Sequence, residues 1–80
     1  MKVQVRLPQW GMGMIEGTIV EWKRKVGDHV STGEPLAEVE AAKVTTDLEC
    51  PDTGVLTEIL VPAGTTVEIY TALAVIETSE

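Results

Sequence analysis

The sequence predicts an all-β fold, a flattened sandwich of two small antiparallel sheets, and three observations support it. A stretch of 24 residues recurs 37 positions later without a gap. Each copy alternates short runs of β-branched and aliphatic residues with turns that contain glycine or proline. The final apolar run, residues 71–77, is too short for a typical helix. Two similar halves made of short strands indicate two sheets packed face to face.

The repeat relates residues 17–40 to residues 54–77. Seven of the 24 aligned positions are identical, and they are Gly17/Gly54, Glu21/Glu58, Gly27/Gly64, Val30/Val67, Leu36/Leu73, Ala37/Ala74 and Glu40/Glu77. Two further pairs, Ile19/Leu56 and Val39/Ile76, keep the apolar character. The chain is therefore built as two similar halves within one domain, residues 1–80.

Each expected element follows from its residues. The first strand, residues 2–8, alternates Val3, Val5 and Leu7 on one face, as a half-buried strand does. In each half a strand, a turn and a second strand follow, at 17–25, 26–35 and 35–40, then at 54–61, 62–67 and 71–77.

Residues 31–44 also carry helix signals. Ser31 and Glu34 have the spacing of a capping box, and Glu-Ala-Ala-Lys favours a helix. The repeat partner of this segment, residues 71–77, has the pattern of a strand. Val44 and the two threonines after it continue with β-branched side chains. We therefore predict strands here, joined by a hairpin.

The composition narrows the function. Apolar residues make up 44% of the chain, and six basic residues stand against thirteen acidic ones, for a net charge of −7. Binding to nucleic acid requires a basic surface and is disfavoured. The chain shows no leader pattern and no apolar run of membrane-spanning length. We expect a soluble monomer in the cytoplasm or an organelle, with no membrane partner.

Single reactive residues do not assemble into a catalytic pattern. Cys50 is the only cysteine, so the chain cannot form an internal disulfide, and we interpret Cys50 as a small apolar residue at a strand end. His29 is also alone. A metal site around it would need carboxylates such as Asp28, and a solvated loop histidine is the simpler interpretation.

Lys43 is the one lysine or arginine after residue 25, in a region with eleven acidic side chains. The offset of 37 relates position 43 to position 80, so the segment around Lys43 should lie opposite the chain termini, on an exposed hairpin tip. One interpretation is a counter-charge to Glu40 or Asp47. The other is an amine presented between small residues so that an enzyme can acylate it.

Two other segments suggest surface roles. The basic run at residues 23–25 suits either a docking patch for an acidic partner or a solvated strand end that discourages aggregation. Trp10 and Trp22 are expected to be packing residues. The alternation of glycine and methionine over residues 11–14 predicts a flexible apolar surface rather than core.

Three quoted stretches carry a family resemblance: "LPQWGMGMIEGTIVEW", "VGDHVSTGEPLAEVE" before Lys43, and "ECPDTGVLTEILVPAGTTV" after it. The chain resembles the lipoyl domain of dihydrolipoyl acyltransferases in 2-oxo acid dehydrogenase complexes. The resemblance implies a flattened barrel of two four-stranded antiparallel sheets with quasi two-fold symmetry. It also implies that Lys43, on a hairpin tip, is the attachment point for lipoic acid.

The resemblance implies roles for further residues. Recognition by the lipoylating enzyme falls on Glu40, Ala42, Val44, Gly27 and Gly54. Recognition by the decarboxylase component falls on the loop Pro8, Gln9, Trp10, Gly11, Met12, Gly13 and Met14. The motif itself differs from the family: lipoyl domains usually show Glu-Thr-Asp-Lys-Ala and biotinyl domains Glu-Ala-Met-Lys-Met, whereas residues 40–44 are Glu-Ala-Ala-Lys-Val.

The implied function is that of a carrier without catalytic activity of its own. Its swinging lipoyl-lysine arm would move acyl groups and electrons between a thiamine-dependent 2-oxo acid decarboxylase, the acyltransferase catalytic domain and dihydrolipoyl dehydrogenase. A lipoate–protein ligase or lipoyl transferase would load it, in the cytoplasm or in the mitochondrial matrix of a eukaryote. A biotin carboxyl carrier and an unmodified interaction module are the alternatives.

Overall fold

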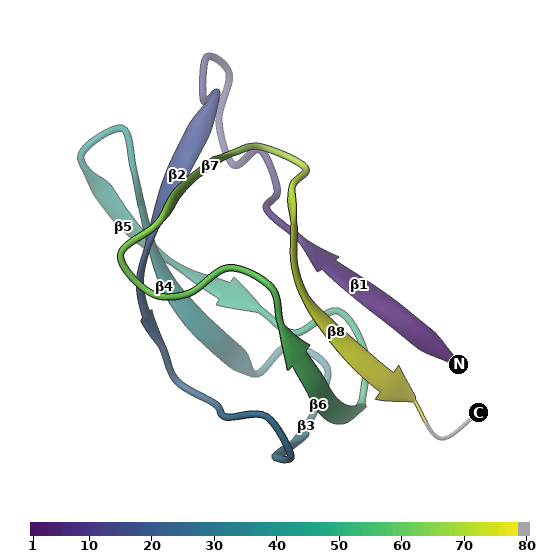
Figure 1. Cartoon of the computed structure of the whole chain (residues 1–80). Helices are drawn as coiled ribbons and strands as arrows, with labels where there is room; N and C mark the ends of the chain where they lie inside the picture. Colours follow the sequence, from purple (N-terminus) through teal and green to yellow (C-terminus); the bar gives the residue numbers. More distant parts are fainter. Residues whose placement is uncertain (79–80) are drawn as a thin grey trace.

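The computed structural model describes residues 1–78, which form two four-stranded antiparallel sheets, as predicted (Figure 1). The strands are β1 (Lys2–Arg6), β2 (Glu16–Trp22), β3 (His29–Val30), β4 (Pro35–Ala41), β5 (Val44–Glu49), β6 (Gly54–Ile59), β7 (Thr66–Glu68) and β8 (Ala72–Thr78). One sheet has the order β1-β8-β6-β3, and the other has the order β5-β4-β2-β7. The described part of the chain contains no helix, and hence none that could cross a membrane.

The two sheets are copies of each other in the arrangement of their strands. By position, β1 corresponds to β5, β8 to β4, β6 to β2 and β3 to β7. The short strands change sides: β3 pairs with β6 of the second half, and β7 pairs with β2 of the first half. Each half therefore contributes a strand to the sheet of the other half, and the two halves interlock.

The symmetry between the two halves also relates the β-bulges of the two sheets. The register shifts just after Ile19 where β2 pairs with β4, and just after Leu56, 37 residues later, where β6 pairs with β8. The amide of Gly27 donates to the Leu56 carbonyl at 2.7 Å, and the amide of Gly64 donates to the Ile19 carbonyl at 2.6 Å. Both glycines have positive φ, 100° and 89°, which glycine adopts without steric cost. The turn of each half thus closes on the β-bulge of the other.

The core between the sheets is also paired by the repeat. The fully buried pairs are Ile19 and Leu56, Leu36 and Leu73, Ala37 and Ala74, and Val39 and Ile76. Val5 and Leu7 are buried while Arg6 is exposed, which confirms the alternation predicted for the first strand. Truncating one of the larger side chains would cost about 2–5 kcal/mol.

The helix signals before β4 are satisfied by a turn. The Ser31 amide donates to a Glu34 carboxylate oxygen at 2.8 Å, and the Glu34 amide donates to the Ser31 carbonyl at 3.0 Å. Arg24 also binds this carboxylate. The Arg24 hydrogen bond, and then the Ser31 amide, hold the pKa of Glu34 below its usual value. The Glu34 side chain thus makes its half of the capping box, but the Glu34 amide bonds the Ser31 backbone carbonyl instead of the serine hydroxyl, and β4 begins one residue later instead of a helix.

The long shape of the domain separates its two ends. Its principal extents are 35 × 21 × 18 Å. Figure 1 shows the hairpin between β4 and β5 at the upper left, and the start of β1 beside the end of β8 at the lower right. The Thr78 amide donates to the Met1 carbonyl at 2.8 Å, which ties these strand ends together. The hairpin that carries Lys43 therefore lies opposite the strand ends, as the offset predicted.

The repeat supplies a matched test of backbone packing. A Cβ added to Gly54 would lie 2.2 Å from the Glu77 carbonyl oxygen. One added to its equivalent, Gly17, would meet side-chain atoms of Val39 at 3.0 Å and Leu7 at 3.3 Å, with a backbone atom, the Glu40 carbonyl oxygen, at an ordinary contact distance of 3.6 Å. We expect Gly54→Ala to lower the free energy of unfolding by about 3 kcal/mol or more, because backbone cannot move aside as a side chain can. Gly17→Ala should cost about 1 kcal/mol. Urea unfolding measures both, and equal losses would contradict this explanation.

Candidate functional site

Lys43 occupies the second position of a two-residue hairpin turn. Ala41 of β4 and Val44 of β5 are the last paired residues, so the turn consists of Ala42 and Lys43 alone. Both have positive φ, 52° and 68°. Positive φ at both central positions defines a type I′ turn, whose twist matches that of the flanking strands. The predicted hairpin tip is confirmed.

This turn is made from residues that do not favour it. Type I′ turns usually contain asparagine, aspartate or glycine, because a Cβ in the left-handed region meets the following carbonyl. Alanine and lysine each carry that cost, of order 1 kcal/mol. The antiparallel pairing of β4 with β5, from Pro35–Glu49 to Ala41–Val44, holds the turn closed despite it. Backbone strain that the rest of the fold enforces is common at functional sites.

The Lys43 side chain is exposed and forms no ion pair with any residue in 1–78. Glu40 is exposed one strand position before the turn. Asp47 lies 3.4 Å from the ammonium of Lys23 instead. The counter-charge interpretation required a pair with one of these two carboxylates, and the structure does not contain it. The second interpretation, an accessible amine, fits the geometry.

The basic run next to β2 is largely engaged within the chain. Lys23 contacts Asp47, and Arg24 binds Glu34. The run lies just beyond the end of β2 at Trp22. Both contacts favour the solvated strand end over a docking patch for residues 23 and 24.

The loop before β2 folds back on itself beside the lysine turn. The Gln9 side-chain amide donates to the Met14 carbonyl at 3.0 Å, and the Met14 amide donates to the Gly11 carbonyl at 3.1 Å. Met12 is 98% exposed, as the predicted apolar surface requires. Met14 is only 7% exposed and packs in the core, so the prediction was wrong for this residue. Its thioether sulfur accepts a hydrogen bond from the Trp10 amide at 3.4 Å.

A depression of about 350 Å³ lies between this loop and the hairpin. We call it the apolar shelf, and it is lined by Trp10, Gly11, Met12, Gly13, Met14, Ala41, Ala42, Val44 and Thr46. None of these side chains is charged. The structure therefore brings most of the loop predicted for partner recognition next to two residues, Ala42 and Val44, predicted for recognition by the ligase.

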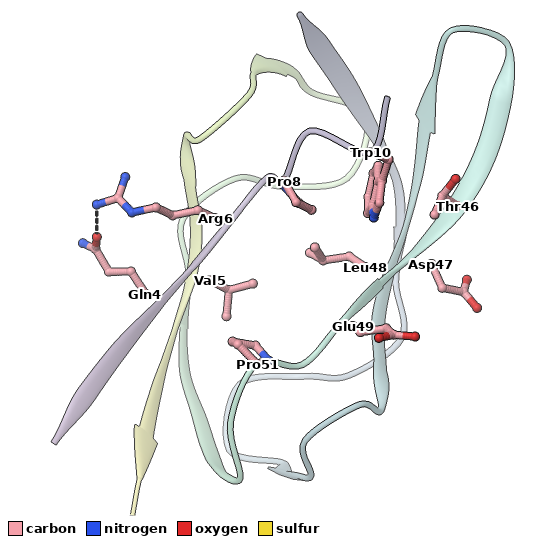
Figure 2. Close-up of a pocket in the computed structure, with 10 residues that line it drawn as sticks. All are labelled: Gln4, Val5, Arg6, Pro8, Trp10, Thr46, Asp47, Leu48, Glu49 and Pro51. Atoms are coloured by element: carbon pink, nitrogen blue, oxygen red, sulfur yellow. Dashed lines mark hydrogen bonds between the residues drawn. The ribbon is translucent and has the colours of Figure 1, made fainter. Parts of the chain in front are cut away.

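A second groove, of about 430 Å³, runs between the edge strands β1 and β5 (Figure 2). Val5 and Leu48 lie at its base, and Asp47 and Glu49 point away from it toward solvent. Pro8 lines this groove and is absent from the shelf, whereas Trp10 lines both. Trp10 is 40% exposed, so the packing prediction holds better for Trp22, whose indole donates to the Val61 carbonyl at 2.8 Å.

The two glycines that the resemblance assigned to ligase recognition are far from the turn in the fold. Gly54 begins β6 and pairs with Val30 of β3 and with Thr78 at the end of β8, and Gly27 bonds to β6. These strands lie at the end of the molecule opposite the hairpin (Figure 1). The structure already explains why glycine is needed at both positions: the backbone of Glu77 approaches Gly54 closely, and Gly27 has a positive φ. A role in ligase recognition stays a prediction.

Cys50 is buried just after β5, which confirms its interpretation as a small apolar residue at a strand end. Burial raises the pKa of its thiol, which donates to the Asp52 carbonyl at 2.7 Å. In residues 1–78, no three histidine, cysteine or acidic side chains are grouped so that they could hold a metal ion.

Sequence reasoning missed two residues at the site, Ala41 and Thr46. Along β5, Val44, Thr46 and Leu48 share one face, and Leu48 is buried. Ala41 lies opposite Val44. The face that enters the core thus continues past the end of the sandwich and becomes the shelf. The alternation of these residues was the available signal.

The interlocked sandwich and the accessible lysine on a tight turn at its end are those of a small carrier domain. Residues 3–76 match a family model described as "Biotin-requiring enzyme", which unites biotinyl and lipoyl domains. The chain therefore belongs to the biotinyl/lipoyl family.

Curated relatives narrow the resemblance within this family. The dihydrolipoyllysine-residue succinyltransferase component of the 2-oxoglutarate dehydrogenase complex of Staphylococcus saprophyticus is 41% identical over 91% of this chain and 17% of its own length. The dihydrolipoyllysine-residue acetyltransferase component of the pyruvate dehydrogenase complex of Corynebacterium glutamicum is 40% identical over 95% of this chain and 11% of its own. The resemblance to lipoyl domains of acyltransferases is confirmed.

A third relative is named as another component. The pyruvate dehydrogenase E1 component subunit beta of Rhizobium meliloti is 38% identical over 95% of this chain and 17% of its own length. The chain thus spans less than a fifth of each of these three relatives.

The strain in the turn can be tested by the same substitution at two neighbouring alanines. Asparagine tolerates the left-handed region, so Ala42→Asn should raise the free energy of unfolding by about 1 kcal/mol, or the Tm by about 4–8 °C. Ala41→Asn places a polar group in β4 beside the core, where no positive φ exists, and should lower the Tm. Thermal unfolding by circular dichroism measures both. A lower Tm for Ala42→Asn would contradict the strain.

Proposed function

We propose that this domain is a lipoyl carrier and that Lys43 is joined by an amide to lipoic acid. The observation that carries the proposal is the exposed lysine without an ion pair in residues 1–78, on a strained two-residue turn. Membership of the biotinyl/lipoyl family, and relatives named for a dihydrolipoyllysine residue, support lipoic acid as the group attached. When bound, lipoic acid supplies a dithiolane that accepts an acyl group together with two electrons.

The contribution of the chain is presentation. The β4–β5 pairing fixes the turn in one geometry, and small alanines before Lys43 leave its amine open to the enzyme that acylates it. No catalytic role is assigned to the domain's own side chains. Covalent tethering makes each later transfer effectively intramolecular, which raises the local concentration of the reacting group. A net charge of −7 keeps such a mobile carrier soluble.

The partners follow from the same proposal. A lipoate–protein ligase or lipoyl transferase would load Lys43 and recognise the turn through Glu40, Ala42 and Val44. The loaded domain would visit a thiamine-dependent 2-oxo acid decarboxylase, an acyltransferase catalytic domain and dihydrolipoyl dehydrogenase. The names of the relatives support this set, because they include acyltransferase components and a pyruvate dehydrogenase component.

We also propose where the domain works. Some relatives come from bacteria, and two, from Dictyostelium discoideum and Schizosaccharomyces pombe, are named as mitochondrial. The domain would act in the cytoplasm of a bacterium or in the mitochondrial matrix of a eukaryote.

Intact mass tests the attachment site. Incubation with lipoate, ATP and a lipoate–protein ligase should add one lipoyl group to the wild-type domain and none to Lys43→Arg, which keeps the charge and the fold but lacks the acylated amine. Parallel incubation with biotin and biotin ligase, followed by a streptavidin blot, tests the biotin carrier. Lipoylation of the Lys43→Arg variant would contradict the proposal. So would a wild-type domain that is biotinylated but not lipoylated.

The position of the lysine within the turn can be tested separately. Consecutive turn residues direct their side chains differently, so we expect the double variant Ala42→Lys, Lys43→Ala to be folded but unmodified by the ligase. Circular dichroism verifies the fold, and intact mass gives the modification. Efficient lipoylation of this variant would show that an exposed lysine anywhere on the tip is sufficient.

A further inference from the structure

The apolar shelf leaves large hydrophobic side chains in contact with solvent next to the modified lysine. Met12 is 98% exposed, Val44 is 60% exposed and Trp10 is 40% exposed. The shelf is hollow, at about 350 Å³, which is within the range of small-molecule sites. A grouped, exposed apolar surface around a hollow marks a binding site more often than isolated exposed residues do.

The position of the shelf identifies its occupant. Ala41, Ala42 and Val44 are three of the four residues that form the turn around Lys43, and all three line the shelf. The Lys43 backbone is therefore flanked on both sides by residues of this hollow, and a group on its side chain is tethered next to it. Amide formation also removes the lysine charge, so the tether crosses an uncharged rim.

The chemistry of the shelf matches that of a lipoyl group. Methylene chains and a dithiolane ring are apolar, and burying them against carbon-rich walls is favourable. Sulfur makes favourable contacts with aromatic rings and packs against flexible methionine side chains, and Trp10 and Met12 offer both. No charged side chain lines the shelf to oppose an apolar ring.

We propose that the apolar shelf is a resting site for the lipoyl arm of Lys43 in the same chain, with the dithiolane ring held between Met12 and Trp10 on one side and Val44 on the other. The inference rests on the proposed function, because it needs lipoic acid on Lys43. The hollow is open to solvent, so the arm leaves and returns readily. The loop thereby acts on the carrier's own cofactor as well as on any partner.

Tryptophan fluorescence tests the contact directly, because a disulfide quenches an indole that it touches. Trp10 lines the shelf, whereas Trp22 bonds to the Val61 carbonyl elsewhere in the fold. Trp22→Phe leaves Trp10 as the only reporter, and Trp10→Phe leaves Trp22 as the matched control. Intact mass first verifies complete lipoylation of each protein.

We expect the oxidised lipoyl arm to lower Trp10 emission at least twofold in the Trp22→Phe domain, and reduction of the dithiolane with a phosphine to restore it. Trp22 emission in the Trp10→Phe domain should change by less than a tenth. Adding Met12→Gln should halve the quenching of Trp10. Leu60→Gln, at another exposed apolar residue that does not line the shelf, should leave the quenching unchanged.

Nuclear Overhauser effects in the wild-type domain supply a readout that needs no substitution. Protons of the dithiolane ring should show contacts to the Met12 and Val44 methyl groups and none to those of Val55 on β6. Full lipoylation with neither quenching nor these contacts would overturn the resting site and leave the proposed function intact. A domain that gains no lipoyl mass would overturn both, and shelf contacts seen only when a decarboxylase is added would assign the shelf to that partner instead.

Discussion

The fold depends on a reciprocal pair of hydrogen bonds between its halves. Gly27 of the first half donates to Leu56 of the second, and Gly64 of the second donates to Ile19 of the first. Around these bonds β3 and β7 are exchanged between the two sheets. Neither half can cover its own apolar face, because the core pairs one residue from each copy of the repeat. The sandwich therefore forms as a whole, which suits a domain of only 80 residues.

This interlock lets the far end of the molecule carry strain. The left-handed conformations of Ala42 and Lys43 are costly, and the β4–β5 pairing that enforces them is anchored in a fully buried core through Leu36 and Val39. A rigid end with one accessible amine is what covalent loading requires. The same end exposes the continuation of the core face of β5 as part of the apolar shelf, so the accessible lysine and an apolar surface both belong to the β4–β5 hairpin.

Much of this could be predicted from the sequence, because the repeat is a long-range signal. An offset of 37 residues overrode the local helix preference of residues 31–44 and placed Lys43 opposite the strand ends. Side-chain destinations in irregular segments were harder to predict. Met14 was expected at the surface. In a loop of alternating glycine and methionine, the sequence pattern does not distinguish a buried methionine from an exposed one. The bonds of Met14 with Gln9 and Gly11 in the folded loop show which methionine turns inward.

Backbone conformation was also beyond the sequence at three non-glycine positions, Ala42, Lys43 and Tyr70. Tyr70 has φ 68°, where its repeat equivalent, Gly33, has φ 85°. The pairing of equivalent turns could have suggested this, because the Gly33 amide donates to the Cys50 carbonyl as the Tyr70 amide donates to that of Leu7. Tyrosine itself argued against a positive φ, because residues with a large side chain rarely adopt one. The capping-box pair was also misleading: the Glu34 carboxylate bonds the Ser31 amide as in a box, but the Glu34 amide bonds the Ser31 backbone carbonyl, and the segment is a turn.

The lysine turn has one more property, which follows from the symmetry. By position in the sheets, β1 to β4 form one half and β5 to β8 the other, so Ala42 and Lys43 are the covalent link between two interchangeable units. A short, strained link between such units is the arrangement from which domain-swapped dimers arise, since straightening the link relieves the strain while the pairings between the units, such as β1 with β8 and β3 with β6, can be remade with a second chain. The residue proposed to carry the lipoyl group thus also lies in the link whose closure keeps the two units paired within one chain.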